Sequence, residues 1–258
     1  MKQLSIPLFF FLLFASTTQA GTQCRARIAD PQEWAYATRT ALHIVDELEQ
    51  RNQPLALIAR VGTDLGKHGI RYSHVGFVVR DHRDGRWTVL HLLNRCGSER
   101  SALYSEGLIN FFADDLVSQD SRIVWLTSSR ADALLQLLNS TAIHRLHEPH
   151  YNLIAHPESD HFQNSTSWAL ELLAASTLQS TDTSRRQAHA AMQAFGYQPY
   201  SLHIPYRKRI AGGLFAANMH FTDHSVGTRL SGNYPVVTVE SIFAWLQRNG
   251  WIEASLDT

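Results

Sequence analysis

An excess of charge of one sign is missing from this chain. Lysine and arginine together number 23, as do aspartate and glutamate, so the formal net charge is zero. Proteins that bind nucleic acid or an anionic membrane through their bulk charge carry a basic excess. The composition therefore excludes recruitment by bulk charge, and we expect no nucleic-acid partner.

Long apolar runs are missing after the first 20 residues. The chain opens with Lys2, an apolar stretch from Leu4 to Ala15, and the small-residue sequence Thr18-Gln19-Ala20, which together are typical of a secretory signal peptide. The apolar stretch is shorter than the roughly 20 residues that span a bilayer. We predict a periplasmic or secreted protein, cleaved near Ala20, with no membrane span thereafter. Residues 21–258 then form a single domain with a C-terminal helical extension.

Cysteine is scarce, with Cys24 and Cys96 as the two in the sequence. An even pair in an oxidising compartment indicates a disulfide, which would join the start of the mature chain to the end of a predicted strand. The chain-entropy model gives roughly 4 kcal/mol for closing a loop of that length. The alternative is a free, reactive thiol at Cys96.

The segment Arg71–Leu93 carries the strongest local pattern. Two β-rich stretches flank Asp84-Gly85, a dipeptide typical of a hairpin turn. Side chains alternate faces along a strand, so His74 and Gly76 share a face, and a turn with an even number of residues adds His91 to it. Two adjacent imidazoles, with space beside them at Gly76, could form the floor of a catalytic site. Because the chain has 14 histidines, a purely structural role for the pair is the alternative.

Periodicity predicts a mixture of helices and strands, and therefore an α+β fold. The predicted helices span Pro31–Arg51, Arg130–Leu146, Arg185–Phe195 and Thr238–Asn249, with another beginning at Asn164 or Ser165. Besides the hairpin, strands are expected over Leu55–Val61, Arg122–Thr127 and Tyr151–Ala155, and a short helix or ordered loop over Ser101–Asp115. Residues 200–235 carry no pattern that predicts an element.

The helix that begins near Ser165 is a candidate position for a nucleophile. Free N–H groups and the helix dipole stabilise negative charge at a helix start. A serine there still needs a base within hydrogen-bond reach, which His74 could supply with His91 as its orienting partner. The alternative is that Ser165 only caps the helix. Spacing alone favours that alternative.

Several motifs carry a resemblance to known proteins. They are R-V-G-T-D-L (60–65), R-Y-S-H-V-G (71–76), W-T-V-L-H-L-L-N-R-C (87–96), Y-S-E-G (104–107), Y-N-L-I-A-H-P (151–157) and F-Q-N-S-T-S-W-A-L-E-L-L (162–173). The chain resembles the bacterial secreted proteins of domain-of-unknown-function family 2145 over most of its length to about Leu173. The S-H-V-G strand is also similar to the histidine strand of circularly permuted, papain-like enzymes of the NlpC type. In those enzymes the histidine strand and a polar third residue precede a cysteine at a helix start, an order that His74, His91 and Ser165 reproduce.

The resemblance implies a papain-like antiparallel sheet with helices packed on it, and an amidase, peptidase or acyl-transfer site made of Ser165, His74 and His91. It implies no cofactor, and a small-molecule, peptide or cell-envelope substrate of unknown identity. Gln163 or Tyr72 would contribute to an oxyanion hole. The two cysteines also match, which supports their pairing.

One residue departs from the family pattern. The family has Q-N-C-N-x-W at the helix start, whereas this chain has Q-N-S-T-S-W, so Ser165 stands at the cysteine position. A hydroxyl cannot form the ion pair with histidine that a thiol forms, and the exchange usually costs several orders of magnitude in rate. The alternative function is a non-catalytic periplasmic binding module that uses the same cleft.

A third hypothesis is a periplasmic metal-binding protein. His144, His147 and His150 are three residues apart and would share a helix face, and His156 and His161 follow closely. Pro149 argues against a regular helix there. The sequence therefore predicts no metal ligand with a defined geometry.

Overall fold

A computed structural model describes residues 30–114, 116–209 and 218–258. The predicted signal peptide and Cys24 lie outside these residues, so the pairing of Cys24 with Cys96 stays a prediction. Within the described part of the chain, no helix combines the length and apolar character needed to cross a membrane.

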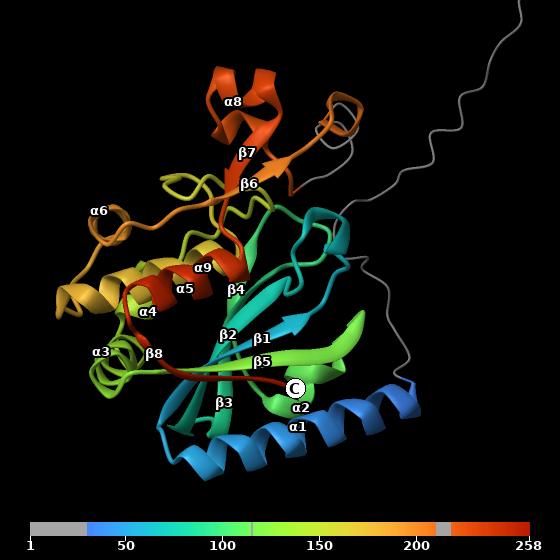
Figure 1. The fold of residues 1–258 in the computed structure, drawn as a ribbon, viewed down its shortest axis with the longest axis vertical. Coiled ribbons are helices and arrows are strands. Elements are labelled where there is room, and N and C mark those ends of the chain that lie inside the picture. The colour runs from blue at the N-terminus through green and yellow to red at the C-terminus, as the bar shows by residue number, and fades with distance from the viewer. Residues whose placement is uncertain (1–29, 115, 210–217) are drawn as a thin grey trace, which may run out of the picture.

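The core of the molecule is an antiparallel sheet with strand order β4-β3-β2-β1-β5-β8 (Figure 1). Its strands are β1 (Leu55–Val61), β2 (His74–His82), β3 (Gly85–Asn94), β4 (Ser101–Gly107), β5 (Ser118–Leu126) and β8 (Ile252–Asp257). Every neighbouring pair is antiparallel. The predicted α+β class with an antiparallel sheet is confirmed.

The predicted hairpin is β2–β3, and its register fixes the faces of both strands. His82 pairs with Gly85, so the two-residue turn is Arg83-Asp84 instead of the predicted Asp84-Gly85. Gly85 takes the positive φ of 137° that follows this turn. The even number of turn residues is unchanged, and His74 and His91 therefore share a face as predicted.

Helices cover both faces of the sheet and divide the core in two (Figure 1). One face carries α1 (Pro31–Arg51) and α2 (Leu108–Ala113), which bury Ile58, Val78 and Val89. The other face buries the alternate residues of the same strands, such as Phe77 and Leu90. It is covered by α3 (Ser128–Leu138), α4 (Ala142–Arg145), α5 (Ser165–Ala175), α6 (Arg185–Ala194) and α9 (Val239–Arg248).

Helix α1 has the bounds that its sequence predicts. Asp30 caps it by accepting a hydrogen bond from the backbone N–H of Gln32 at 2.9 Å, and Pro31 occupies the first turn. Its buried stripe consists of Ala37, Ala41, Ile44 and Leu48, whereas Trp34 in the first turn is exposed.

Helix α5 begins where predicted, with Asn164 as its N-cap and a reciprocal capping box that includes Ser167. Every residue of α5 is buried, including Glu171. That carboxylate forms ion pairs with Arg185 at 2.8 Å and His189 at 3.2 Å, both from α6. Arg185 also donates to the carbonyls of Ser159 and Phe162, so the pair anchors the loop that leads into α5.

Five regions differ from the sequence prediction. The stretch predicted as a short helix or loop over 101–115 begins with strand β4, and the predicted helix 130–146 divides into α3 and α4. Tyr151–Ala155 forms only an isolated bridge, from Tyr151 to Gln163. Residues 200–236 contain a two-stranded ribbon, β6 (Tyr200–His203) and β7 (Asn233–Val236), and the short helix α8 (Val226–Ser231). After α9 the chain returns to the sheet as β8, which no periodicity predicted.

Candidate functional site

The two predicted histidines are in direct contact. His74 on β2 and His91 on β3 lie with Nε2 and Nδ1 2.8 Å apart, and their ring centroids are separated by 5.1 Å. Both side chains are buried. The alternation of β2 and β3 places them on the face that α1 and α2 cover, since His74 pairs in register with Arg60 and both rings contact Phe111 of α2.

Gly76 is the residue that allows this approach. A Cβ atom at this position would lie 2.8 Å from Val89 Cγ1, 3.2 Å from His91 Cβ and 3.2 Å from the carbonyl oxygen of Leu90. The first distance is shorter than real Cβ contacts, so no larger residue fits without displacing β3. The glycine of the S-H-V-G motif is therefore required by the packing of the second histidine.

Glu106 on β4 extends the pair into a chain of three groups. His91 Nε2 lies 2.9 Å from Glu106 Oε1, which is an ion-pair distance, and in the described part of the chain this nitrogen forms no hydrogen bond of regular geometry. Glu106 pairs in register with Val89, two residues before His91, so both side chains lie on the same face. The order is carboxylate, imidazole, imidazole, running from the partly exposed Glu106 to the buried His74.

Burial sets the protonation of both rings. Desolvation lowers the pKa of His74 well below its ordinary value of 6.5, and the nearby Arg60 charge lowers it further. Desolvation also lowers the pKa of His91, while Glu106 opposes that change. Both rings are thus neutral at pH 7. With one proton per ring, we assign His74 as the donor from Nε2 to His91 Nδ1 across their 2.8 Å contact. The proton of His91 is then on Nε2, which faces Glu106, and His74 Nδ1 keeps its lone pair.

Arg60 and Phe111 cover the two rings. The Arg60 guanidinium lies 4.4 Å above the Phe111 ring, forms an ion pair with Asp114 at 2.6 Å and donates to the carbonyl of Phe111. Phe111 in turn lies 5.9 Å from the His74 ring and 5.4 Å from the His91 ring. The space next to the imidazoles on this face is filled by protein atoms.

The structure does not bring Ser165 to the histidine pair. Ser165 is the first residue of α5, and α5 packs on the opposite face of the sheet, where Trp168 contacts Phe77 at 5.7 Å between ring centroids. Among the described residues, neither imidazole makes a hydrogen bond to Ser165. Burial raises the pKa of Tyr151 to about 12, and the neighbouring Ser165 side chain opposes that change. The expected contact between hydroxyl and base is therefore absent, because the β-strand alternation directs the base away from α5.

The two residues expected at an oxyanion hole have other partners. The Gln163 side-chain amide donates to the carbonyl of Leu146 at 2.8 Å and to Glu171 at 2.7 Å, and its oxygen accepts from the N–H of Glu148 at 2.9 Å. The Tyr72 hydroxyl donates to Asp257 at 2.8 Å. Neither side chain is placed to donate to a substrate oxygen.

Two of the histidines between residues 144 and 161 have separate local partners. His147 Nε2 lies 3.0 Å from Ser101 Oγ, and His150 Nδ1 lies 2.6 Å from Glu148 Oε1. In the described ranges, no three His, Cys, Asp or Glu side chains converge on a point that could hold a metal ion.

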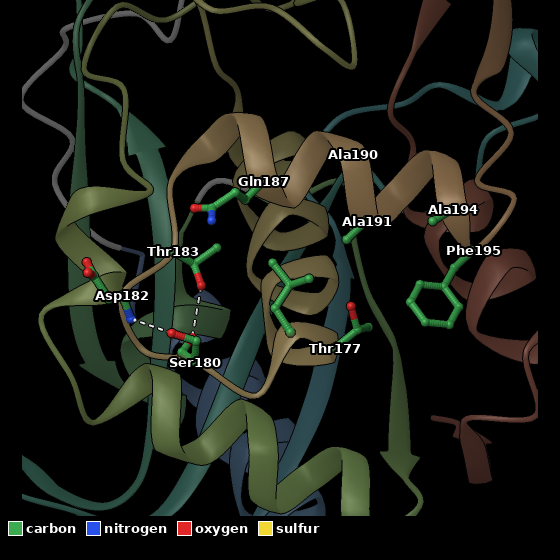
Figure 2. Close-up of a pocket in the computed structure, with 10 residues that line it drawn as sticks. Thr177, Ser180, Asp182, Thr183, Gln187, Ala190, Ala191, Ala194 and Phe195 are labelled. Carbon is green, nitrogen blue, oxygen red and sulfur yellow. Dashed lines mark hydrogen bonds between the residues drawn. The ribbon is translucent and has the colours of Figure 1, made fainter.

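A hollow of about 650 Å³ lies away from the histidine pair, between the end of α5 and α6 (Figure 2). Its wall is mostly apolar, with Ala191, Ala194 and Phe195 at one end. Gln187 and Thr183 place polar groups at the other end, where Thr183 Oγ1 donates to the carbonyl of Ser180 at 2.9 Å.

Sequence reasoning missed Glu106, Arg60, Phe111 and Tyr151. Glu106 lies in the Y-S-E-G motif, but its relation to His91 depends on the β3–β4 register, and no strand was predicted over those residues. Tyr151 lies in a motif that was read as a strand. An alternation test over residues 101–107 is the signal that could have found Glu106.

An antiparallel sheet with helices packed on both of its faces defines the class as an α+β protein. The chain belongs to a family of uncharacterized proteins conserved in bacteria (DUF2145), whose family model matches residues 47–246. No curated protein matches the chain, and no solved structure does.

Proposed function

We propose that this chain is an exported, non-catalytic binding protein on a papain-like fold of the NlpC type, in which the base side of a hydrolase site persists without a nucleophile. The observation that carries the proposal is the separation of Ser165 from the imidazole pair. The helix that carries Ser165 packs on the sheet face opposite His74, and among the described residues no hydrogen bond joins Ser165 to either imidazole.

The chemistry of serine supports the same conclusion. A hydroxyl is a weak nucleophile unless a base removes its proton, and the base must lie within about 3 Å of it. The phenol of Tyr151 cannot act as that base near neutral pH, because its pKa is raised to about 12. Ser165 then serves the start of α5 and not a reaction.

The hollow beside α6 supports binding of a small, largely apolar ligand. Its volume of about 650 Å³ falls in the range of roughly 300–1,000 Å³ that ligand pockets occupy. Most of its wall is apolar, and Gln187 and Thr183 offer hydrogen-bonding groups at one end. Such a wall fits a molecule with an apolar body and one polar end.

The test is the variant Ser165→Cys, in which a thiol stands at the family's nucleophile position. Alkylation by a fluorescent iodoacetamide is followed as a function of pH, with and without His74→Ala, and the wild-type chain supplies the background. We expect an introduced thiol of ordinary reactivity whose rate does not change when His74 is removed. A thiol that reacts rapidly near pH 6 and slows on His74→Ala would overturn the proposal, because only a thiolate paired with an imidazole behaves in that way.

A matched control measures how much a helix N-terminus by itself changes the reactivity of a thiol, apart from any effect of His74. Ser128 is the first residue of α3, and it is exposed. Ser128→Cys therefore reports how a helix start alone changes thiol reactivity. The Ser165→Cys variant should react no faster than this control.

A second candidate function is hydrolysis, and the chain Glu106–His91–His74 favours it. A neutral imidazole that is oriented by a second imidazole and a carboxylate is the arrangement of a general base. The same experiment decides between the two functions, since a working base must accelerate the introduced thiol in a His74-dependent manner.

A further inference from the structure

Although the net charge of the chain is zero, its basic and acidic residues are unevenly distributed. Between residues 197 and 236 the sequence contains four basic side chains, Arg207, Lys208, Arg209 and Arg229, against one acidic side chain, Asp223. Asp223 is already used, because its oxygens accept from the backbone N–H of His156 at 2.7 Å and from Ser159 Oγ at 2.5 Å. The remaining charge in this region is positive.

These residues belong to a small lobe at one end of the molecule. The β6–β7 ribbon and α8 lie at the end of the long axis opposite α1 (Figure 1). The lobe has its own apolar cluster, in which Ile154, Tyr234 and Val236 are buried.

Three large apolar side chains of the lobe lie outside that cluster. Tyr206 is 68% exposed, Val226 is 62% exposed and Leu230 is 77% exposed. Val226 and Leu230 are four residues apart in α8 and therefore share one of its faces. Exposure of this degree at three positions of one small lobe is a signal of an interaction surface.

The basic residues adjoin these apolar ones. The Arg209 guanidinium lies 5.4 Å from the Tyr206 ring centroid and donates to the carbonyl of Arg229, the residue before Leu230. Arg209 thus joins the segment that begins at Tyr206 to the end of α8. Arg207 and Lys208, both exposed, extend the positive charge from there.

We propose that this surface, made of Tyr206, Arg207, Lys208, Val226 and Leu230, docks on an anionic phospholipid membrane. Exposed aliphatic and aromatic side chains enter the boundary between headgroups and acyl chains, and adjacent Lys and Arg side chains pair with lipid phosphates. The combination of exposed apolar side chains and adjacent basic ones favours this partner, since an anionic membrane offers an apolar boundary and phosphates side by side. This docking is independent of the binding function proposed above, because it involves neither the histidine pair nor the hollow beside α6.

The experiment is co-sedimentation of the mature full-length chain with vesicles of phosphatidylglycerol and phosphatidylethanolamine, compared with vesicles of phosphatidylcholine alone. We expect binding to the anionic vesicles that weakens as salt is raised. Arg207→Gln combined with Lys208→Gln should weaken binding by about tenfold to thirtyfold, since each basic residue near an anionic surface contributes roughly fivefold. Val226→Ser combined with Leu230→Ser should weaken binding at every salt concentration.

Matched variants on α1 and the hairpin turn complete the test. Arg39→Gln with Arg83→Gln removes the same charge at exposed positions elsewhere, and Leu42→Ser removes an exposed leucine of α1. These variants should bind as the wild type does. Absence of binding to the anionic vesicles at low salt, or equal losses in the lobe variants and their matched controls, would overturn the proposal.

Discussion

Replacement of Gly76 by alanine tests how tightly β2 packs against β3 at the histidine pair. The new methyl carbon would lie 2.8 Å from Val89 Cγ1 and 3.2 Å from two further atoms, one of them the backbone oxygen of Leu90. Val89 is fully buried against α1 and α2, so it cannot swing aside.

The expected loss of unfolding free energy is about 1–3 kcal/mol, the cost of inserting a methyl group into a packed core. For a chain of this size that corresponds to a decrease in Tm of about 2–4 °C per kcal/mol. Urea unfolding followed by tryptophan fluorescence measures it. Gly107→Ala is the control, because a Cβ there meets no atom within 4 Å and should change stability little.

A double variant locates the cause. Val89→Ala removes the Cγ1 atom that the methyl group would meet, so Gly76→Ala should cost markedly less in that background than in the wild type. Equal costs in both backgrounds would refute the packing argument. So would a Gly76→Ala protein whose unfolding free energy lies within about 0.5 kcal/mol of wild type.

Two further predictions concern buried titratable groups. Burial lowers the pKa of His74 and of His91 below 6.5, so as the pH falls the unfolded chain binds protons before the folded chain does. The free energy of unfolding should therefore be highest above pH 6.5. At lower pH it should decrease by at most about 1.4 kcal/mol per pH unit for each ring. Urea unfolding between about pH 7 and pH 5 measures this slope, and a His74→Gln variant that keeps the full slope would contradict it. Glu171→Gln should cost about 3–5 kcal/mol in thermal or urea unfolding, because it leaves the Arg185 charge buried without its carboxylate. Asp160→Asn, which breaks an exposed pair, should leave the midpoint unchanged, and equal effects of the two variants would count against a special role for burial.

The fold was predictable wherever a period and a boundary residue coincide. Helix α1 begins at Pro31 behind Asp30, and α5 begins at Ser165 behind Asn164, as the capping chemistry predicts. Strand β8 was not predictable, because its pairing with β5 is set by tertiary packing after α9 and not by a turn next to it in the sequence. Partial burial of alternate residues gives β8 only a weak apolar pattern.

Only the part of the candidate site that lies within one hairpin, the pair His74 and His91, was predictable from the sequence. His74 and His91 are joined by one hairpin, so parity and a short turn are enough to place them together. The relation of Ser165 to that pair depends on which sheet face α5 covers. Strand alternation states which residues share a face, but it does not say which helix packs there. The match of the order His74, His91, Ser165 to the permuted enzymes therefore could not decide the geometry.

The sheet joins parts of the chain that are very far apart in sequence, and this has a consequence for how the molecule forms. The meander β2–β3–β4 closes with short turns, whereas β5 and β8 are held together by Arg122 and Asp257, 135 positions apart. Closing a long segment is entropically costly, so the local meander should assemble early and the outer edge of β5 should be covered late. During that interval β5 is an open edge strand that carries Ile123 and Trp125, two residues of the core on the α1 side of the sheet. This chain should therefore aggregate most readily when it refolds at high protein concentration.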